Sequence, residues 1–191
     1  AQADSILAEY FYLHTVWWYC IPPVTGMRCT ISGRAQAVIE QELNRFPDTE
    51  TGGLLLGYSE PENGISILEA TDSGYQNTVH TVGSFRYDTA YEEHLCNLLS
   101  LLYQPPLQLV GVWHKHNSAH LNSGLPFSFA DEKIHGQLLE NPFPCISILF
   151  EKISTNKSSI HYNARIFLLS PSRNHCDITN ATVWEKDLSP A

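Results

Sequence analysis

The chain has 191 residues, of which 43% are hydrophobic, and its formal net charge is −9. This length and composition predict one soluble domain with a full core. The acidic balance, without a basic stripe to neutralise phosphates, excludes nonspecific nucleic-acid binding but permits a partner with a basic face. No apolar run is long enough for a membrane span, and no signal-peptide pattern opens the chain.

The five cysteines are widely spaced and include no C-x-x-C pair. This pattern indicates neither a disulfide framework nor a thiolate zinc site. A reducing, cytoplasmic location is therefore expected.

Residues 1–26 are rich in aromatic side chains. Such side chains are costly to leave in water, so we expect this N-terminal extension to pack on the domain itself or on a partner. Pro22, Pro23 and Gly26 interrupt the chain. Residues 27–191 then form the folded domain.

Apolar residues recur every three to four positions in some segments and form short uninterrupted runs in others, which are the patterns of helices and strands. In chain order, the first half of the chain predicts a helix over 33–46, a strand over 54–56, a hairpin turn over 59–64, a strand over 65–70 and a long loop with short strands over 72–88. A helix over 89–103, a strand over 107–113 and a helix over 128–139 follow. The last predicted elements are strands over 145–150 and 160–170, joined by a turn over 154–159, and a short strand over 178–184.

This order predicts an α/β or α+β domain with one mixed sheet and helices packed on its faces. The second helix carries an apolar stripe that we expect to lie in the core. The stripe consists of Tyr91, Leu95, Leu98, Leu99 and Leu102.

His114 and His116 stand two positions apart at the end of the strand over 107–113. Side chains at this spacing point to the same face of a strand. Asp131 follows in the first turn of the next predicted helix, where Ser128 can act as the N-cap. Two imidazoles and one carboxylate predict a three-ligand zinc site that leaves a fourth position for water, as catalytic sites do.

Glu50 stands at the start of an apolar strand, next to Gly52 and Gly53. This acid is a candidate second carboxylate of the active site; the alternative is a solvated acid in a turn. For His80 a surface or loop-packing role is expected, and His120 is expected to be a loop or substrate-facing residue rather than a third imidazole ligand.

Taken together, Glu50, His114-x-His116 and Ser128-x-x-Asp131 resemble the signature of the JAMM metalloproteases, also called the JAB/MPN-plus family. The segment ETGGLLLGY is similar to the first strand of the bacterial branch, and the resemblance covers roughly residues 27–170. The chain departs from the pattern in two ways: the loop between His116 and Ser128 is longer than usual, and Asn117 stands where a proline usually follows the second histidine.

The resemblance implies a single JAB/MPN domain, a cytidine-deaminase-like fold with a curved mixed sheet flanked by helices. It implies one Zn²⁺ per chain, held by His114, His116 and Asp131. It also implies that Glu50 acts as general base and then acid, and that Ser128 donates a hydrogen bond to the oxyanion.

The activity implied by the resemblance is hydrolysis of the amide bond after the C-terminal glycine of a ubiquitin-like protein. The partners would be this substrate and the activating and conjugating enzymes of the same pathway, in a bacterial antiphage defence system. We further expect Gly52 and Gly53 to border a narrow channel for a Gly-Gly tail. The alternatives are a sulfur-carrier or amino-acid-adduct peptidase of the same fold and a non-catalytic MPN scaffold.

Overall fold

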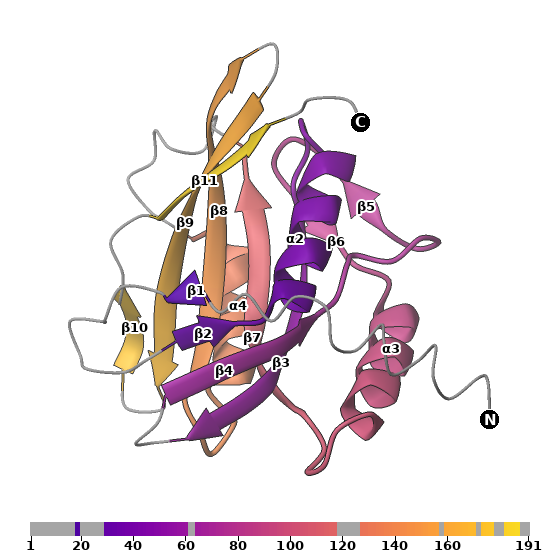
Figure 1. Ribbon diagram of the computed structural model, residues 1–191, viewed down its shortest axis with the longest axis vertical. Coiled ribbons are helices and arrows are strands. Elements are labelled where there is room, and N and C mark those ends of the chain that lie inside the picture. Colours follow the sequence, from indigo (N-terminus) through magenta and orange to yellow (C-terminus); the bar gives the residue numbers. More distant parts are fainter. Residues whose placement is uncertain are drawn as a thin grey trace.

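The computed structural model describes residues 18–19, 29–60, 64–117, 127–156, 159–170, 173–177 and 182–187 (Figure 1). Most of the aromatic N-terminal extension, His120 and most of the loop between His116 and Ser128 lie outside these residues. The predictions made for those segments therefore stay predictions.

One curved mixed sheet forms the centre of the molecule, with nine strands among the described residues, in the order β1-β2-β4-β3-β7-β8-β9-β10, while β11 pairs with the outer edge of β9. In chain order these strands are β1 Trp18–Tyr19, β2 Cys29–Ile31, β3 Thr51–Glu60, β4 Gly64–Ala70, β7 Gln108–His116, β8 Cys145–Asn156, β9 Ser159–Ser170, β10 Arg173–Asp177 and β11 Thr182–Asp187. The pairs β2–β4 and β7–β8 are parallel and the other pairs are antiparallel. The fold is thus α+β with a mixed sheet, as predicted.

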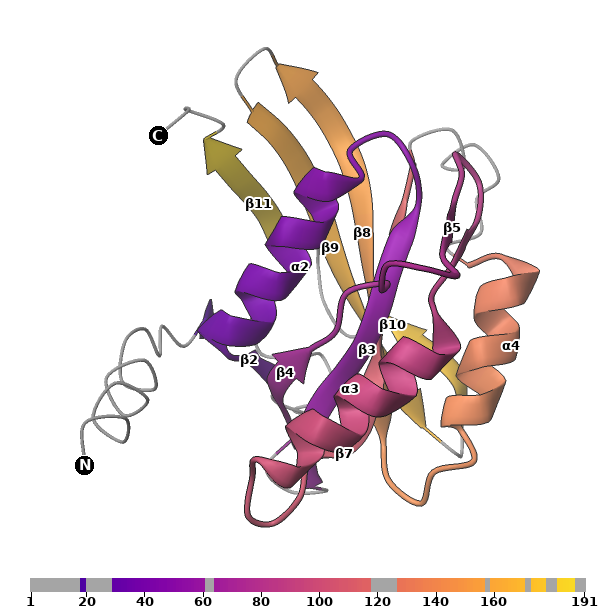
Figure 2. The same ribbon diagram turned by 90° about the vertical axis from the view of Figure 1, so that its right-hand side faces the viewer.

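Among the described residues, three helices flank the sheet: α2 Gly33–Arg45, α3 Thr89–Leu101 and α4 Phe129–Leu138. Figure 2 shows α2 and α4 on opposite sides of β3, with α3 in front of the lower part of β3. A small hairpin of β5 Val79–His80 and β6 Phe85–Arg86 precedes α3. Each helix has a polar N-cap of the expected kind, Ser32, Asp88 and Ser128, whose side chain accepts a backbone N–H of the first turn.

The core is divided between the two faces of the sheet. On the α2 side, Ile39 and Leu43 pack with Leu55 and Trp113. On the α4 side, Leu138 packs with residues that include Val112. This division places α4 over one face of β7 and α2 over the other.

A β-bulge in β7 sets which residues face each side. Leu55 pairs with Gly111 and Leu56 with Leu109, so Val110 is the extra residue. After the bulge, the side chains alternate along the strand. His114 and His116 therefore share the α4 face with Val112, and Lys115 shares the α2 face with Trp113.

The prediction that the apolar stripe of α3 lies in the core was wrong in part. Leu98 and Leu102 are 51% and 57% exposed, and Glu92 is the buried residue of this helix. Tyr91, Leu95 and Leu99 instead line a groove of about 560 Å³ between α3 and α2. The rotation of the helix lets Glu92 accept a hydrogen bond from Thr71, and three of the five stripe residues face the rest of the protein.

The ends of several other elements also differ from their predicted positions. The strand predicted over 107–113 continues through both histidines, and the turn predicted over 154–159 is shorter because β8 and β9 extend into it. The last predicted strand lies later, at β11, and the residues 178–181 are outside the described part. The short strands β1, β2 and β10 were not predicted from the sequence.

Candidate metal centre

His114 and His116 lie at the end of β7, on the face that α4 covers. Both are buried, and their Nε2 atoms are 3.1 Å apart. The spacing of two residues in an extended strand brings the two rings together, as predicted. The strand is held on both sides, because His114 pairs with Gly52 of β3 and with Leu149 of β8.

Asp131 approaches from the first turn of α4. Its Oδ1 lies 3.5 Å from Nε2 of His114 and its Oδ2 lies 3.4 Å from Nε2 of His116. A capping box fixes the carboxylate, because Oδ2 also accepts the N–H of Ser128 at 2.7 Å while the Ser128 hydroxyl accepts the N–H of Asp131. The helix start therefore orients the third member of the predicted site.

The three side chains fit a metal ion. Ligand atoms of His114, His116 and Asp131 all lie within 4.8 Å of one another. Tetrahedral zinc with bonds of about 2.0–2.2 Å requires ligand atoms about 3.3–3.6 Å apart, close to the spacings found here. A carboxylate and two imidazole nitrogens converging on one point are a donor set that zinc accepts. The described residues thus include a group that could hold a metal ion.

The charges at this site favour a cation. Burial lowers the pKa of His114 to about 4, which keeps its ring in the neutral form that binds metals. Burial also opposes protonation of His116, but Asp131 outweighs it and the pKa of His116 lies above its usual value. For Asp131, burial favours the neutral acid, yet His116, His114 and the Ser128 N–H hold its pKa well below the usual range. The carboxylate is therefore ionised at neutral pH.

Glu50 lies directly before β3 and is buried, with 6% of its surface exposed. Burial raises its pKa to about 7, His116 counteracts this and Asp131 adds to it. The solvated-turn alternative is thus wrong, since the carboxyl group is enclosed and interacts with two members of the site. A carboxyl group that titrates near neutral pH is suited to accept and release a proton.

Ser128 is exposed, and its hydroxyl oxygen accepts the N–H of Asp131 at 3.3 Å. The residue therefore serves α4 as its N-cap. Its expected role as a donor to an oxyanion stays a prediction.

Gly52 and Gly53 lie in close contact with neighbouring backbone and side-chain atoms. A Cβ atom on Gly52 would lie 2.5 Å from the Phe85 ring and 2.5 Å from the backbone oxygen of Trp113, and one on Gly53 would lie 2.2 Å from the Thr71 oxygen. In the direction of a Cβ atom the space at both glycines is filled by the protein, so their small size serves the packing of β3. The expected Gly-Gly channel at this point stays a prediction.

Two aromatic rings lie beside His114. Phe85 stacks on His114 with 6.5 Å between ring centroids, and Phe127 lies 6.2 Å from the same ring. His135 contacts Phe127 edge-on, and its Nε2 lies 3.0 Å from the Ser147 hydroxyl oxygen. None of the four residues Phe85, Phe127, His135 and Ser147 was predicted to be near the site. The spacing of His135, four positions after Asp131 on the same helix, was the one available signal for that residue.

His80 takes the packing role expected of it. Its ring stacks on Phe46 with 3.6 Å between centroids, and its Nδ1 lies 3.0 Å from the Glu50 carbonyl oxygen. The contact with Glu50 could not be read from the sequence, because the two residues are thirty positions apart.

Comparisons with known proteins identify no family. No family model matches the chain, and no curated protein matches it. Among solved structures, the solution structure of protein DSY2949 from Desulfitobacterium hafniense is similar at 12% identity and a TM-score of 0.45, covering 82% of this chain and 88% of that one. None of the described helices has the length and apolar character of a membrane span. The function is therefore inferred from the residues of this chain.

Proposed function

We propose that this protein is a zinc-dependent peptidase of the JAMM type, built on a JAB/MPN domain. One observation carries the proposal: two imidazoles and a carboxylate converge within 4.8 Å, and Glu50, a carboxyl group whose pKa burial raises to about 7, lies beside them. A purely structural zinc site closes its coordination with four protein ligands. Three ligands and an adjacent proton acceptor are the arrangement of a hydrolytic site.

Different residues have different roles in the proposed hydrolysis. His114, His116 and Asp131 would hold the ion, and a bound zinc ion supplies Lewis acidity that makes water a nucleophile at neutral pH. Glu50 accepts a proton from the attacking water and returns it to the leaving nitrogen. Phe85 and Phe127 exclude bulk water from the His114 side, which strengthens electrostatic interactions there.

The substrate proposed is the amide bond that follows the C-terminal glycine of a ubiquitin-like protein, in a bacterial antiphage system with its own activating and conjugating enzymes. The support for this choice is the combined motif Glu50, His114-x-His116 and Ser128-x-x-Asp131.

The test uses a ubiquitin-like protein fused through its terminal glycine to a reporter, with a sulfur-carrier fusion as a second substrate. We expect cleavage at the glycine that a chelator stops and added Zn²⁺ restores. Glu50→Gln should keep one zinc per chain and lower kcat by about 100-fold or more, because proton transfer contributes about 10²–10⁴ to the rate.

The matched control is Glu132→Gln, which changes an exposed acid in the first turn of α4 and should leave turnover unchanged. Unchanged turnover in Glu50→Gln would refute the proton-transfer role. Bound zinc without cleavage of either fusion would favour a non-catalytic scaffold.

A further inference from the structure

The loop over residues 46–50, between α2 and β3, carries Glu50 into the site. Four of its five carbonyl oxygens accept hydrogen bonds from side chains of other segments. The donors are Lys115 to the oxygen of Phe46, Lys152 to that of Pro47 at 3.2 Å, Asn117 to that of Asp48 at 2.8 Å and His80 to that of Glu50 at 3.0 Å. Side chains thus hold a segment that has no regular backbone pairing of its own.

Asn117 has a central place among these donors. It directly follows the metal ligand His116, and 8% of its surface is exposed. Its single amide nitrogen donates to the carbonyl oxygen of Asp48 at 2.8 Å and to that of Val82, in the turn between β5 and β6, at 3.2 Å. Both partners can only accept, so the orientation of the amide is determined by them.

The same turn also contacts Glu50 itself. The backbone N–H of Glu50 donates to the carbonyl oxygen of Thr81 at 2.7 Å, next to the residue that Asn117 binds. Asn117 therefore joins three segments: the metal-binding strand β7, the loop of Glu50 and the β5–β6 hairpin. Lys115 and Lys152 hold the other end of the loop, through the carbonyl oxygens of Phe46 and Pro47.

We propose that Asn117 is a positioning residue that fixes the carboxyl group of Glu50 relative to His114, His116 and Asp131. The two hydrogen bonds of its amide hold the loop two residues before Glu50 and the turn that binds the Glu50 N–H. Its effect on the rate rests on the proposed peptidase function. Its effect on the loop does not, and can be measured separately.

The test is Asn117→Asp, which keeps the shape of the side chain but opposes two carbonyl oxygens with carboxylate oxygens. We expect hydrogen exchange of the Glu50 amide to accelerate by about tenfold or more, since the segment that protects it is released. The matched control is Asn44→Asp: Asn44 also donates to a backbone carbonyl, that of Glu40 within α2 at 2.6 Å. This control should leave exchange at Glu50 unchanged.

The second measurement separates positioning from metal binding. Asn117→Asp should bind one Co²⁺ per chain with the visible absorption of the wild type, because all three ligands remain. On the cleaved fusion substrate, kcat should fall by about 100-fold, the size of effect expected when a reacting group is displaced by about 1 Å. KM should stay within about twofold.

Wild-type exchange at Glu50 in the folded variant, or loss of Co²⁺ binding, would overturn the proposal. If the wild type cleaves no fusion, the peptidase function fails while amide exchange still decides the role of Asn117. Should Asn117→Asp not fold, Asn117→Ala removes the donor without adding charge, and the same two outcomes apply to it.

Discussion

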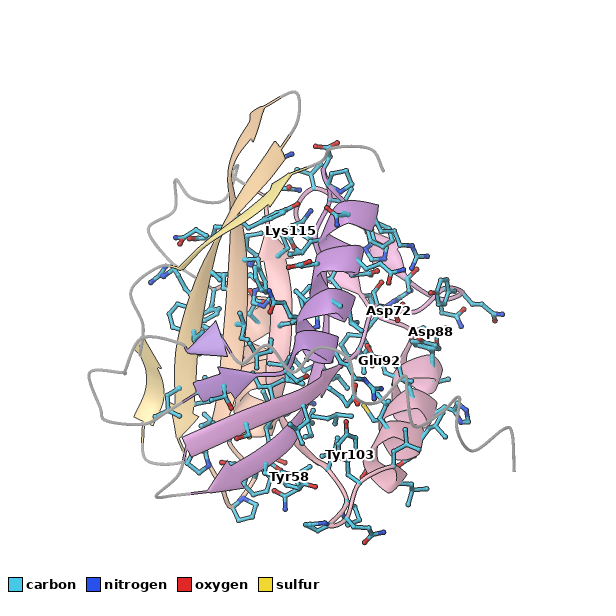
Figure 3. All side chains as sticks on the ribbon, viewed as in Figure 1. Tyr58, Asp72, Asp88, Glu92, Tyr103 and Lys115 are labelled. Carbon is cyan, nitrogen blue, oxygen red and sulfur yellow. The ribbon has the colours of Figure 1, made fainter. Side chains whose placement is uncertain are left out.

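Buried carboxyl groups dominate the electrostatics of two regions, the candidate metal centre and the start of α3. In the second region Glu92 is 2% exposed; its Oε1 accepts the Thr71 hydroxyl at 2.8 Å, and its Oε2 has no hydrogen-bond partner. Figure 3 shows Glu92 with Asp72 and Asp88 around the first turn of this helix. Burial foremost, with neighbouring acids such as Asp72, raises the pKa of Glu92 to about 8, and the hydrogen bond from Thr71 opposes this shift.

This shift predicts a pH-dependent stability. The folded protein binds the Glu92 proton more tightly than the unfolded chain, whose pKa is near 4.5. The stabilisation is complete below that pH and is lost as the pH rises through about 8. Glu92→Gln cannot ionise, so its Tm relative to the wild type should increase between pH 5 and 8, by about 2–4 °C per kcal/mol of linked free energy.

Calorimetry across this pH range measures the difference in Tm. Glu93→Gln, on the exposed side of the same helix, is the control and should show no such trend. Parallel pH profiles for Glu92→Gln and the wild type would contradict a protonated Glu92.

The start of β3 shows how an element is built around close backbone contacts. Gly53→Ala would place a Cβ atom 2.2 Å from the backbone oxygen of Thr71, a group that cannot rotate away. We expect a loss of about 1–3 kcal/mol in the free energy of unfolding, the usual cost of overpacking. Urea denaturation measures it, and wild-type stability would show that β3 can move away from Thr71.

Gly136 in α4 is the matched control for this substitution. A Cβ atom there would meet nothing within 4 Å, and the position is exposed. Because glycine loses more backbone entropy than alanine on entering a helix, Gly136→Ala should raise the free energy of unfolding by about 0.5–1 kcal/mol. The same substitution thus acts in opposite directions in the two elements.

Most helices and strands were predictable, because the apolar residues of a helix recur about every 3.6 positions and those of a strand about every 2 positions. The apolar stripe of α3 is an exception. Leu98 and Leu102 repeat at helical spacing, yet both are exposed. The period gives the stripe but not the rotation of α3, which follows from the pairing of Glu92 with Thr71 far away in the chain.

At the scale of the whole molecule, the candidate metal centre joins the sheet to a helix on its surface, since His114 and His116 lie on β7 and Asp131 lies on α4. A ligand that binds only the folded state stabilises it by about 2.7 kcal/mol at a free concentration 100 times Kd. Zn²⁺ at that level should therefore raise Tm by roughly 5–10 °C. Thermal unfolding with and without chelator measures this shift.

His116→Ala should abolish the shift together with any hydrolysis, since one of three ligands is lost. His94→Ala, which removes an exposed histidine on α3, should retain both. An equal rise in Tm for wild type and His116→Ala would mean that the ion binds elsewhere.

The sequence alone determined the parts of this protein that depend on near neighbours. Two positions along a strand place His114 and His116 on one face, and three positions at a helix start couple Ser128 with Asp131. Only the tertiary structure decided that the strand and the helix meet, that Glu50 is buried beside them, and that Asn117 and His80 hold its loop. The contacts of His80 with Glu50 and of Asn117 with Asp48 join residues 30 and 69 positions apart, and no local period records which distant segments pack together.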